Sequence, residues 1–147
     1  MGENGVTAVH CAASNMNLCS GTAPVREMLE RGVSVALGSD IAGGDQLAMY
    51  QVVTASIRAS KVKRMETGAA FLTVPEAYWL GTTAGHRYFG AGDGFAAGDP
   101  LHAIVVDDSG LPEPVRELSL PERFERAIYL MDKGHIAAVY SDGRRVR

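Results

Sequence analysis

The sequence predicts an α/β protein in which a parallel strand pair and its helices are followed by a small β-rich region. Apolar strand patterns at residues 6–9 and 33–37 flank a helical pattern at residues 23–31. A strand, a helix and a strand joined by short connections predict two neighbouring parallel strands with a right-handed crossover. A turn-rich connector after residue 90 then changes the composition. We therefore expect two regions, residues 1–90 and residues 91–147.

In the first region, each element has a local signal. Pro24 suits the first turn of a helix that Gly32 would end, and the apolar run at 33–37 is typical of a strand buried on both faces. Apolar spacing predicts a helix over residues 46–63, and the pair Thr73 and Glu76 predicts a capping box that opens one helix reaching residue 89. The polar stretch at residues 14–17 is expected to be a loop.

The second region shows a strand, a helix and a hairpin. The apolar run at residues 103–106 predicts a buried strand. Ser119 and Glu122 repeat the capping-box pattern and predict a helix to about Leu130. Residues 136–140 predict a strand that enters a hairpin turn at Asp142-Gly143.

Composition excludes several classes of protein. The 147 residues are 46% hydrophobic with a formal charge of -3, so no basic field exists for a nucleic acid. No run of about 18 apolar residues and no secretion-signal pattern is present, which predicts a cytoplasmic protein that does not cross a membrane. Two cysteines outside any C-x-x-C pair favour free thiols.

His10 and Asp40 are the candidate site residues. Each ends a predicted strand, and parallel strands bring such ends to one edge of a sheet, where parallel-strand enzymes place their chemistry. Taken alone, Asp40 is more typical of a helix cap than of a metal ligand, and His10 is more typical of a structural histidine than of a ligand. Their convergence favours a site. His86, His102 and His135 lack metal-ligand spacing and are interpreted as structural or exposed.

Two linked motifs carry a resemblance to a known family. Residues 10–15, His-Cys-Ala-Ala-Ser-Asn, and residues 38–40, Gly-Ser-Asp, resemble the late-barrel signature of the metal-dependent amidohydrolase deaminases. The extension Ser-Asp-Ile-Ala-Gly-Gly at residues 39–44 is similar to the guanine deaminases of that superfamily. The resemblance continues through residues 71–73, 84–85, 106–109 and 122–130.

The resemblance implies the C-terminal part of a TIM-like (β/α)8 barrel, followed by a β-rich segment of a composite β-sandwich. It also implies hydrolysis of guanine to xanthine and ammonia with one zinc ion. By position, Asp40 would bind zinc and help move a proton, and His10 would lie beside the metal-bound water and the substrate. The remaining zinc ligands and a proton-transferring Glu of the family have no counterpart here.

Chain length limits what these residues can do alone. A barrel needs about 200 residues or more, and zinc needs about three protein ligands, whereas Asp40 supplies one. We therefore expect inactivity in isolation and a missing N-terminal barrel half as partner, with a homodimer possible. Two alternatives remain open: a fragment of another amidohydrolase deaminase or chlorohydrolase, and a non-catalytic pseudoenzyme or interaction subunit. Ala12 where the family has Pro, and His102 before the 103–106 strand, depart from the family pattern.

Overall fold

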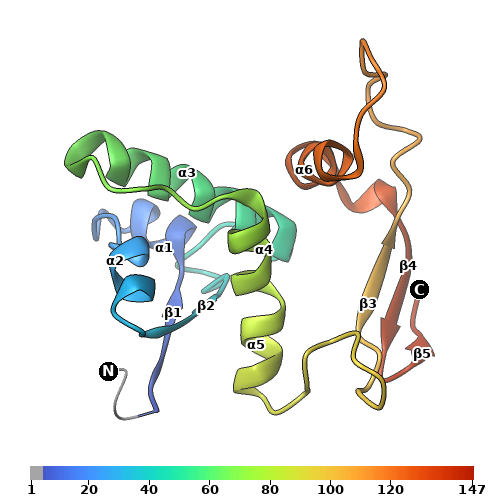
Figure 1. Cartoon of the computed structure of the whole chain (residues 1–147), viewed down its shortest axis with the longest axis horizontal. Helices are drawn as coiled ribbons and strands as arrows, with labels where there is room; N and C mark the ends of the chain where they lie inside the picture. Colours follow the sequence, from blue (N-terminus) through green and yellow to red (C-terminus); the bar gives the residue numbers. More distant parts are fainter. Residues whose placement is uncertain (1–4) are drawn as a thin grey trace. The chain divides into compact units, whose positions relative to one another are not determined.

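The computed structural model describes residues 5–147 and divides into two compact units, Met1–Phe89 and Gly90–Arg147 (Figure 1). The expectation about a secretion signal concerns mainly residues 1–4, which lie outside the described range. Within residues 5–147, no helix combines the length and the apolar character needed to cross a bilayer.

The first unit contains the predicted parallel strand pair. Strand β1 (Thr7–His10) pairs in parallel with β2 (Ser34–Leu37) over four residue pairs, in register from the first residue of each strand to the last. Helices α1 (Ala12–Asn17) and α2 (Val25–Glu30) lie between the two strands in the chain. The prediction of parallel pairing across a short helical connection is confirmed.

Strand β2 is anchored by burial. Val35, Ala36 and Leu37 are all at least 93% buried, although successive side chains of a strand point to opposite faces. Gly32, just before the strand, has φ +71°, the left-handed conformation that glycine adopts without a steric penalty. The predicted strand buried on both faces and its preceding helix end are confirmed.

Helix α3 (Met49–Thr67) begins three residues later and ends four residues later than the predicted 46–63. Gly68 ends it with φ +75° and donates its N–H to the Arg64 carbonyl at 2.7 Å. All six residues from 52 to 57 are buried, so α3 is covered on more than one side. It forms part of a core whose largest fully buried side chains are Ile57, Leu72, Leu80 and Val53.

The single helix predicted from residue 73 to residue 89 is wrong. The structure has two helices, α4 (Val74–Gly81) and α5 (Thr83–Tyr88). Thr82 between them has φ -129° and ψ -85°, which is not helical, and its hydroxyl donates to the Tyr78 carbonyl at 2.7 Å. Apolar periodicity alone does not register such a break, because residues on both sides still face the core.

The second unit is a three-stranded antiparallel sheet with one long helix. The strand order is β3 (Ala103–Val106), β4 (Ile136–Ser141) and β5 (Arg144–Arg145), and α6 (Leu120–Leu130) and a short 3-10 helix (Lys133–His135) lie between β3 and β4 in the chain. The capping box at the start of α6 and the hairpin after β4 are confirmed.

Two details of this sheet are informative. Asp142 and Gly143 both have positive φ, 52° and 73°, as a two-residue type I′ hairpin requires. Strand β3 was predicted to be buried, but Ile104 and Val105 are 45% and 46% exposed, so that prediction is wrong within this chain. Among the described residues, β3 pairs with β4 alone, which leaves its other edge uncovered.

A charged group ties α2 to the start of α4. The Glu76 carboxylate accepts hydrogen bonds from Arg26 Nη2 at 2.8 Å and from the Thr73 N–H at 2.8 Å. The Arg26 guanidinium and the donors of Thr73 together lower the pKa of Glu76 to about 2. The predicted capping box is therefore present, and it also serves as a tertiary contact.

The hydrogen bonds of Glu76 predict that the free energy of unfolding decreases in acid. Because the folded state lowers the pKa of Glu76, its contribution to stability is present above the unfolded-state pKa of about 4.3 and is lost as pH falls toward about 2. The side chain of Glu76 is 39% exposed, so solvent screening limits the contribution to about 1 kcal/mol. Glu76→Gln should lower the free energy of unfolding near neutral pH by that amount. The difference from the parent should become smaller as the pH falls, and urea titrations followed by circular dichroism measure it.

Glu125→Gln is the control. It removes an exposed carboxylate of α6 for which no described residue provides an ion pair, and its stability should stay within error of the parent. Equal effects of the two variants would contradict the prediction.

Candidate functional site

The two candidate residues lie at the same edge of the strand pair. His10 is the last residue of β1, and Asp40 comes three residues after the end of β2. The Gly38 N–H donates to the His10 carbonyl at 3.1 Å, which extends the pairing by one step beyond β2. The predicted convergence of the two strand ends is confirmed.

Asp40 does not cap a helix. Helix α3 begins at Met49, and its N-cap is Ala48. The backbone of Asp40 is left-handed, with φ +45°, and the residue is exposed. Its Oδ2 accepts a hydrogen bond from the Ser14 hydroxyl at 2.5 Å. The capping alternative for Asp40 is therefore excluded.

Helix α1 supplies the partners of the Asp40 loop, and the prediction of a loop at residues 14–17 is wrong. Ser14 and Asn17 are one turn apart on α1 and so share a face. Asn17 Nδ2 donates to the Gly43 carbonyl at 2.9 Å, while Ser14 binds Asp40. The helix thus holds residues 40–43 at two points.

The glycines of the loop are required by space. A Cβ on Gly43 would lie 2.7 Å from Asp40 Oδ2 and 2.7 Å from Ser14 Oγ. A Cβ on Gly44 would lie 2.4 Å from the Ser39 carbonyl oxygen. The Gly44 N–H also donates to the Asp40 carbonyl at 2.6 Å, closing a tight turn. The glycine pair therefore permits the contact between α1 and Asp40.

His10 is a buried imidazole with an unused nitrogen. The residue is 94% buried, and burial lowers its pKa, so the ring is neutral near pH 7. No described residue hydrogen-bonds to its Nδ1. A buried polar atom without a partner is uncommon in folded proteins. A neutral imidazole here can donate one hydrogen bond and accept another.

The nearby thiol is not activated. Burial, and then the negative charge of Asp40, raise the pKa of Cys11, which keeps it protonated. Both Cys11 and Cys19 are free, as predicted.

The other three histidines lie outside β1 and β2, the two strands that lead to the candidate site. His86 lies on α5, and the two remaining histidines lie beside aspartates of the second unit. His102 Nε2 is 3.7 Å from Asp142, and His135 Nδ1 is 2.9 Å from Asp132.

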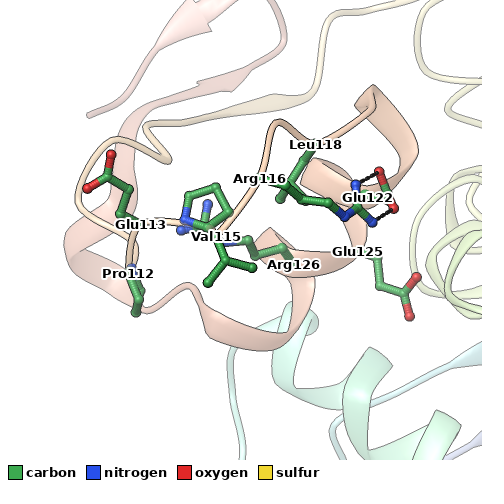
Figure 2. A pocket seen from close by; sticks show the side chains of 9 residues that line it. Pro112, Glu113, Val115, Arg116, Leu118, Glu122, Glu125 and Arg126 are labelled. Atoms are coloured by element: carbon green, nitrogen blue, oxygen red, sulfur yellow. Dashed lines mark hydrogen bonds and ion pairs between the residues drawn. The ribbon is translucent and has the colours of Figure 1, made fainter.

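Among residues 5–147, each unit has a hollow on its surface. The first, of about 460 Å³, lies between α6 and the preceding proline-containing loop, and the Arg116–Glu122 ion pair forms part of its wall (Figure 2). It contains no histidine, cysteine or aspartate. The second, of about 360 Å³, adjoins the Asp40 loop through Asn17. Its lining residues are Ala13, Met16, Asn17, Asp45, Gln46, Ala55 and Arg58.

Comparison with known proteins identifies the family. The model of the amidohydrolase family matches residues 1–146, and the chain belongs to this family. Guanine deaminases are among its relatives: that of Dictyostelium discoideum is 30% identical over 145 residues, covering 94% of this chain. The solved guanine deaminase of C. acetobutylicum with bound guanine is 39% identical, with a TM-score of 0.91 over 99% of this chain. The resemblance carried by the two motifs is confirmed.

The chain spans about a third of the length of these relatives, 32% and 35% respectively. An adenosine deaminase from Xanthomonas campestris with bound zinc shares the fold, with a TM-score of 0.81, 24% identity, and coverage of 97% of this chain and 32% of that one. The fold is therefore common to deaminases of different substrates, and one such protein holds zinc.

The described residues do not form a complete zinc site. In residues 5–147, no group of three His, Cys, Asp or Glu side chains could hold a metal ion. Asp40 presents an exposed carboxylate at this edge, and no described residue donates a hydrogen bond to its Oδ1. One carboxylate is fewer than the roughly three or more protein ligands that a zinc ion needs.

Sequence reasoning missed Ser14 and Asn17 as supports of Asp40. Their spacing of three residues places both side chains on one face only if the segment is helical, so it could not serve as a signal while a loop was expected there. Gly43 was recognised only as part of a motif, whereas its structural role is to leave room for a hydrogen bond.

A substitution tests the space at Gly43. Gly43→Ala should displace Asp40 from Ser14 and destabilise the protein by about 1–3 kcal/mol, the usual cost of overpacking. Gly85→Ala is the matched control, because its Cβ meets nothing within 4 Å and its backbone φ is not left-handed. Alanine at that helical position should be neutral or stabilise by up to about 1 kcal/mol. Chemical denaturation measures both, and an unaffected Gly43→Ala variant would refute the steric argument.

Proposed function

We propose that this chain is the C-terminal part of a zinc-dependent guanine deaminase, which converts guanine and water to xanthine and ammonia. The observation that carries the proposal is the likeness to the solved C. acetobutylicum enzyme, 39% identical across 99% of this chain. The contact between Ser14 and Asp40 also supports it. This contact needs a residue without a side chain at position 43, and the guanine-deaminase-like motif at residues 39–44 has glycine there.

Residues 1–90 would contribute late strands of a (β/α)8 barrel, and residues 91–147 would contribute to a β-sandwich. A described sheet of only two strands, with Val9 57% exposed, is consistent with further strands beside it. One edge of β3 pairs with no described strand, which is consistent with a neighbouring strand in a β-sandwich. The proposed partner is thus the N-terminal barrel half, and a homodimer is compatible with this arrangement.

Asp40 would supply one zinc ligand and help move a proton. Its free Oδ1 and its exposed position suit a carboxylate that binds a cation, whose remaining ligands would come from the N-terminal half. When bound, zinc would supply Lewis acidity toward water. The chain itself provides orientation of the carboxylate.

His10 would face the substrate as a neutral imidazole. Its lowered pKa keeps it uncharged near pH 7, and its Nδ1 is buried without a partner among the described residues. A neutral ring can accept a proton or a hydrogen bond from a purine, whereas an imidazolium could only donate. The proposed substrate is guanine or a related purine, and the proposed location is the cytoplasm.

Xanthine formation tests this proposal. With zinc present, guanine should be converted by this chain mixed with the N-terminal half and by neither part alone. Asp40→Ala should lower kcat/KM of the mixture by at least about 100-fold, the upper range for losing groups that support a metal site. Asp45→Ala, which removes an exposed carboxylate five residues further along, should retain activity.

Gel filtration establishes that the two parts have associated before activity is judged. Adenosine and a chlorinated heterocycle serve as competing substrates. Turnover of either one without guanine turnover would favour another amidohydrolase reaction. An associated mixture that acts on none of them would make the chain a non-catalytic subunit.

A further inference from the structure

We propose that Ser14 is a positioning residue for Asp40: its hydroxyl sets the direction of the carboxylate, and the missing side chain of Gly43 keeps open the space in which they meet. The inference rests on the proposed function in that it gives Asp40 a part in the site. The contact itself can be tested independently of that function.

The hydrogen bond has the features of a strong one. Ser14 is 97% buried on α1, and its Oγ lies 2.5 Å from Asp40 Oδ2. An O–H group that donates to an ionised carboxylate forms a short, charge-assisted bond, roughly twice as strong as a neutral one. Asp40 is exposed, and an exposed aspartate without such a partner exchanges between staggered rotamers. The Ser14 hydroxyl selects one of them and leaves Oδ1 accessible.

The surrounding backbone leaves Ser14 and Asp40 little freedom to separate. Asn17, one turn further along α1, binds the Gly43 carbonyl at 2.9 Å and so fixes the glycine beside the carboxylate. A Cβ at Gly43 would intrude on Asp40 Oδ2 and Ser14 Oγ equally, at 2.7 Å from each. Helix α1 itself is held by Ala12, which packs in a buried cluster with Ala55 and Ala59 of α3. The direction of the carboxylate is therefore linked to the packing of two helices.

Such support matters for a carboxylate that binds a metal or moves a proton. Partners that orient a ligating group typically contribute 10–100-fold to metal affinity or activity. Ser14→Ala should therefore weaken zinc retention and lower kcat by about tenfold or more, while KM for guanine changes less than about twofold. A purely structural serine would affect the unfolding midpoint and leave zinc affinity unchanged.

The experiment uses the assembled two-part enzyme described above. Zinc affinity is measured by competition with a chromophoric chelator, and kcat and KM are measured with guanine. Ser56→Ala is the matched control: this serine is fully buried on α3, and no described residue hydrogen-bonds to its hydroxyl.

A double-mutant cycle measures the contact without zinc or substrate. Ser14→Ala and Asp40→Ala are combined in the same protein, or in the 147-residue chain if the mixture is inactive. Their effects on the unfolding equilibrium constant should be coupled by about fivefold or more, as expected for a hydrogen bond to a charged group.

The outcomes separate the two proposals. If Asp40→Ala abolishes zinc retention and activity but Ser14→Ala equals Ser56→Ala, the positioning role is overturned and the proposed function stands. If Asp40→Ala changes neither zinc retention nor activity, the proposed function fails, and the double-mutant cycle alone tests whether Ser14 and Asp40 interact. Coupling below about 1.5-fold would overturn the inference in either case.

Discussion

The in-register parallel pairing of β1 with β2 is the constraint on which the site depends. Because His10 pairs with Leu37, the chain that leaves β2 starts beside His10 and reaches Asp40 within three residues. A slip of one residue would move every side chain of the strand to the opposite face. Because both faces of β2 are closely packed, such a slip would also place Val35, Ala36 and Leu37, which differ in size, in spaces filled by another side chain. The same apolar residues that stabilise the core therefore determine where the carboxylate begins.

A second constraint acts after the strand, where the backbone is strained. Asp40 and Ala42 both have positive φ, 45° and 86°, a region that residues with a Cβ seldom occupy. The conformation persists because several contacts act on one short loop: the Gly44 N–H binds the Asp40 carbonyl, and α1 holds Asp40 and Gly43. Strain that is maintained by the surrounding structure is typical of functional sites. Here it places an exposed carboxylate three residues after the buried strand β2.

The strand pair, the placement of His10 and Asp40 and the hairpin at Asp142 could be predicted, because burial patterns and turn residues act locally. Helix α1 could not, since five of its six residues are small or polar and it lacks apolar periodicity. It forms against α3, where Ala12 packs with Ala55 and Ala59, and that contact joins distant positions of the chain. The Ser14–Asp40 bond was missed for the same reason, as it spans 26 residues. The roles of His10 and Asp40 came from family resemblance, which local patterns could not supply.

The two site residues differ in what this chain provides for them. Asp40 receives its orientation from α1 and from the glycine pair, all within the described residues. His10 is buried by this chain, yet its Nδ1 finds no partner there. A buried imidazole nitrogen without a partner costs free energy, so folding of this chain holds His10 in place at the expense of stability. Under the proposed function, this third of the enzyme therefore supplies a pre-oriented carboxylate and a neutral, buried imidazole, while the remaining zinc ligands must come from residues outside it.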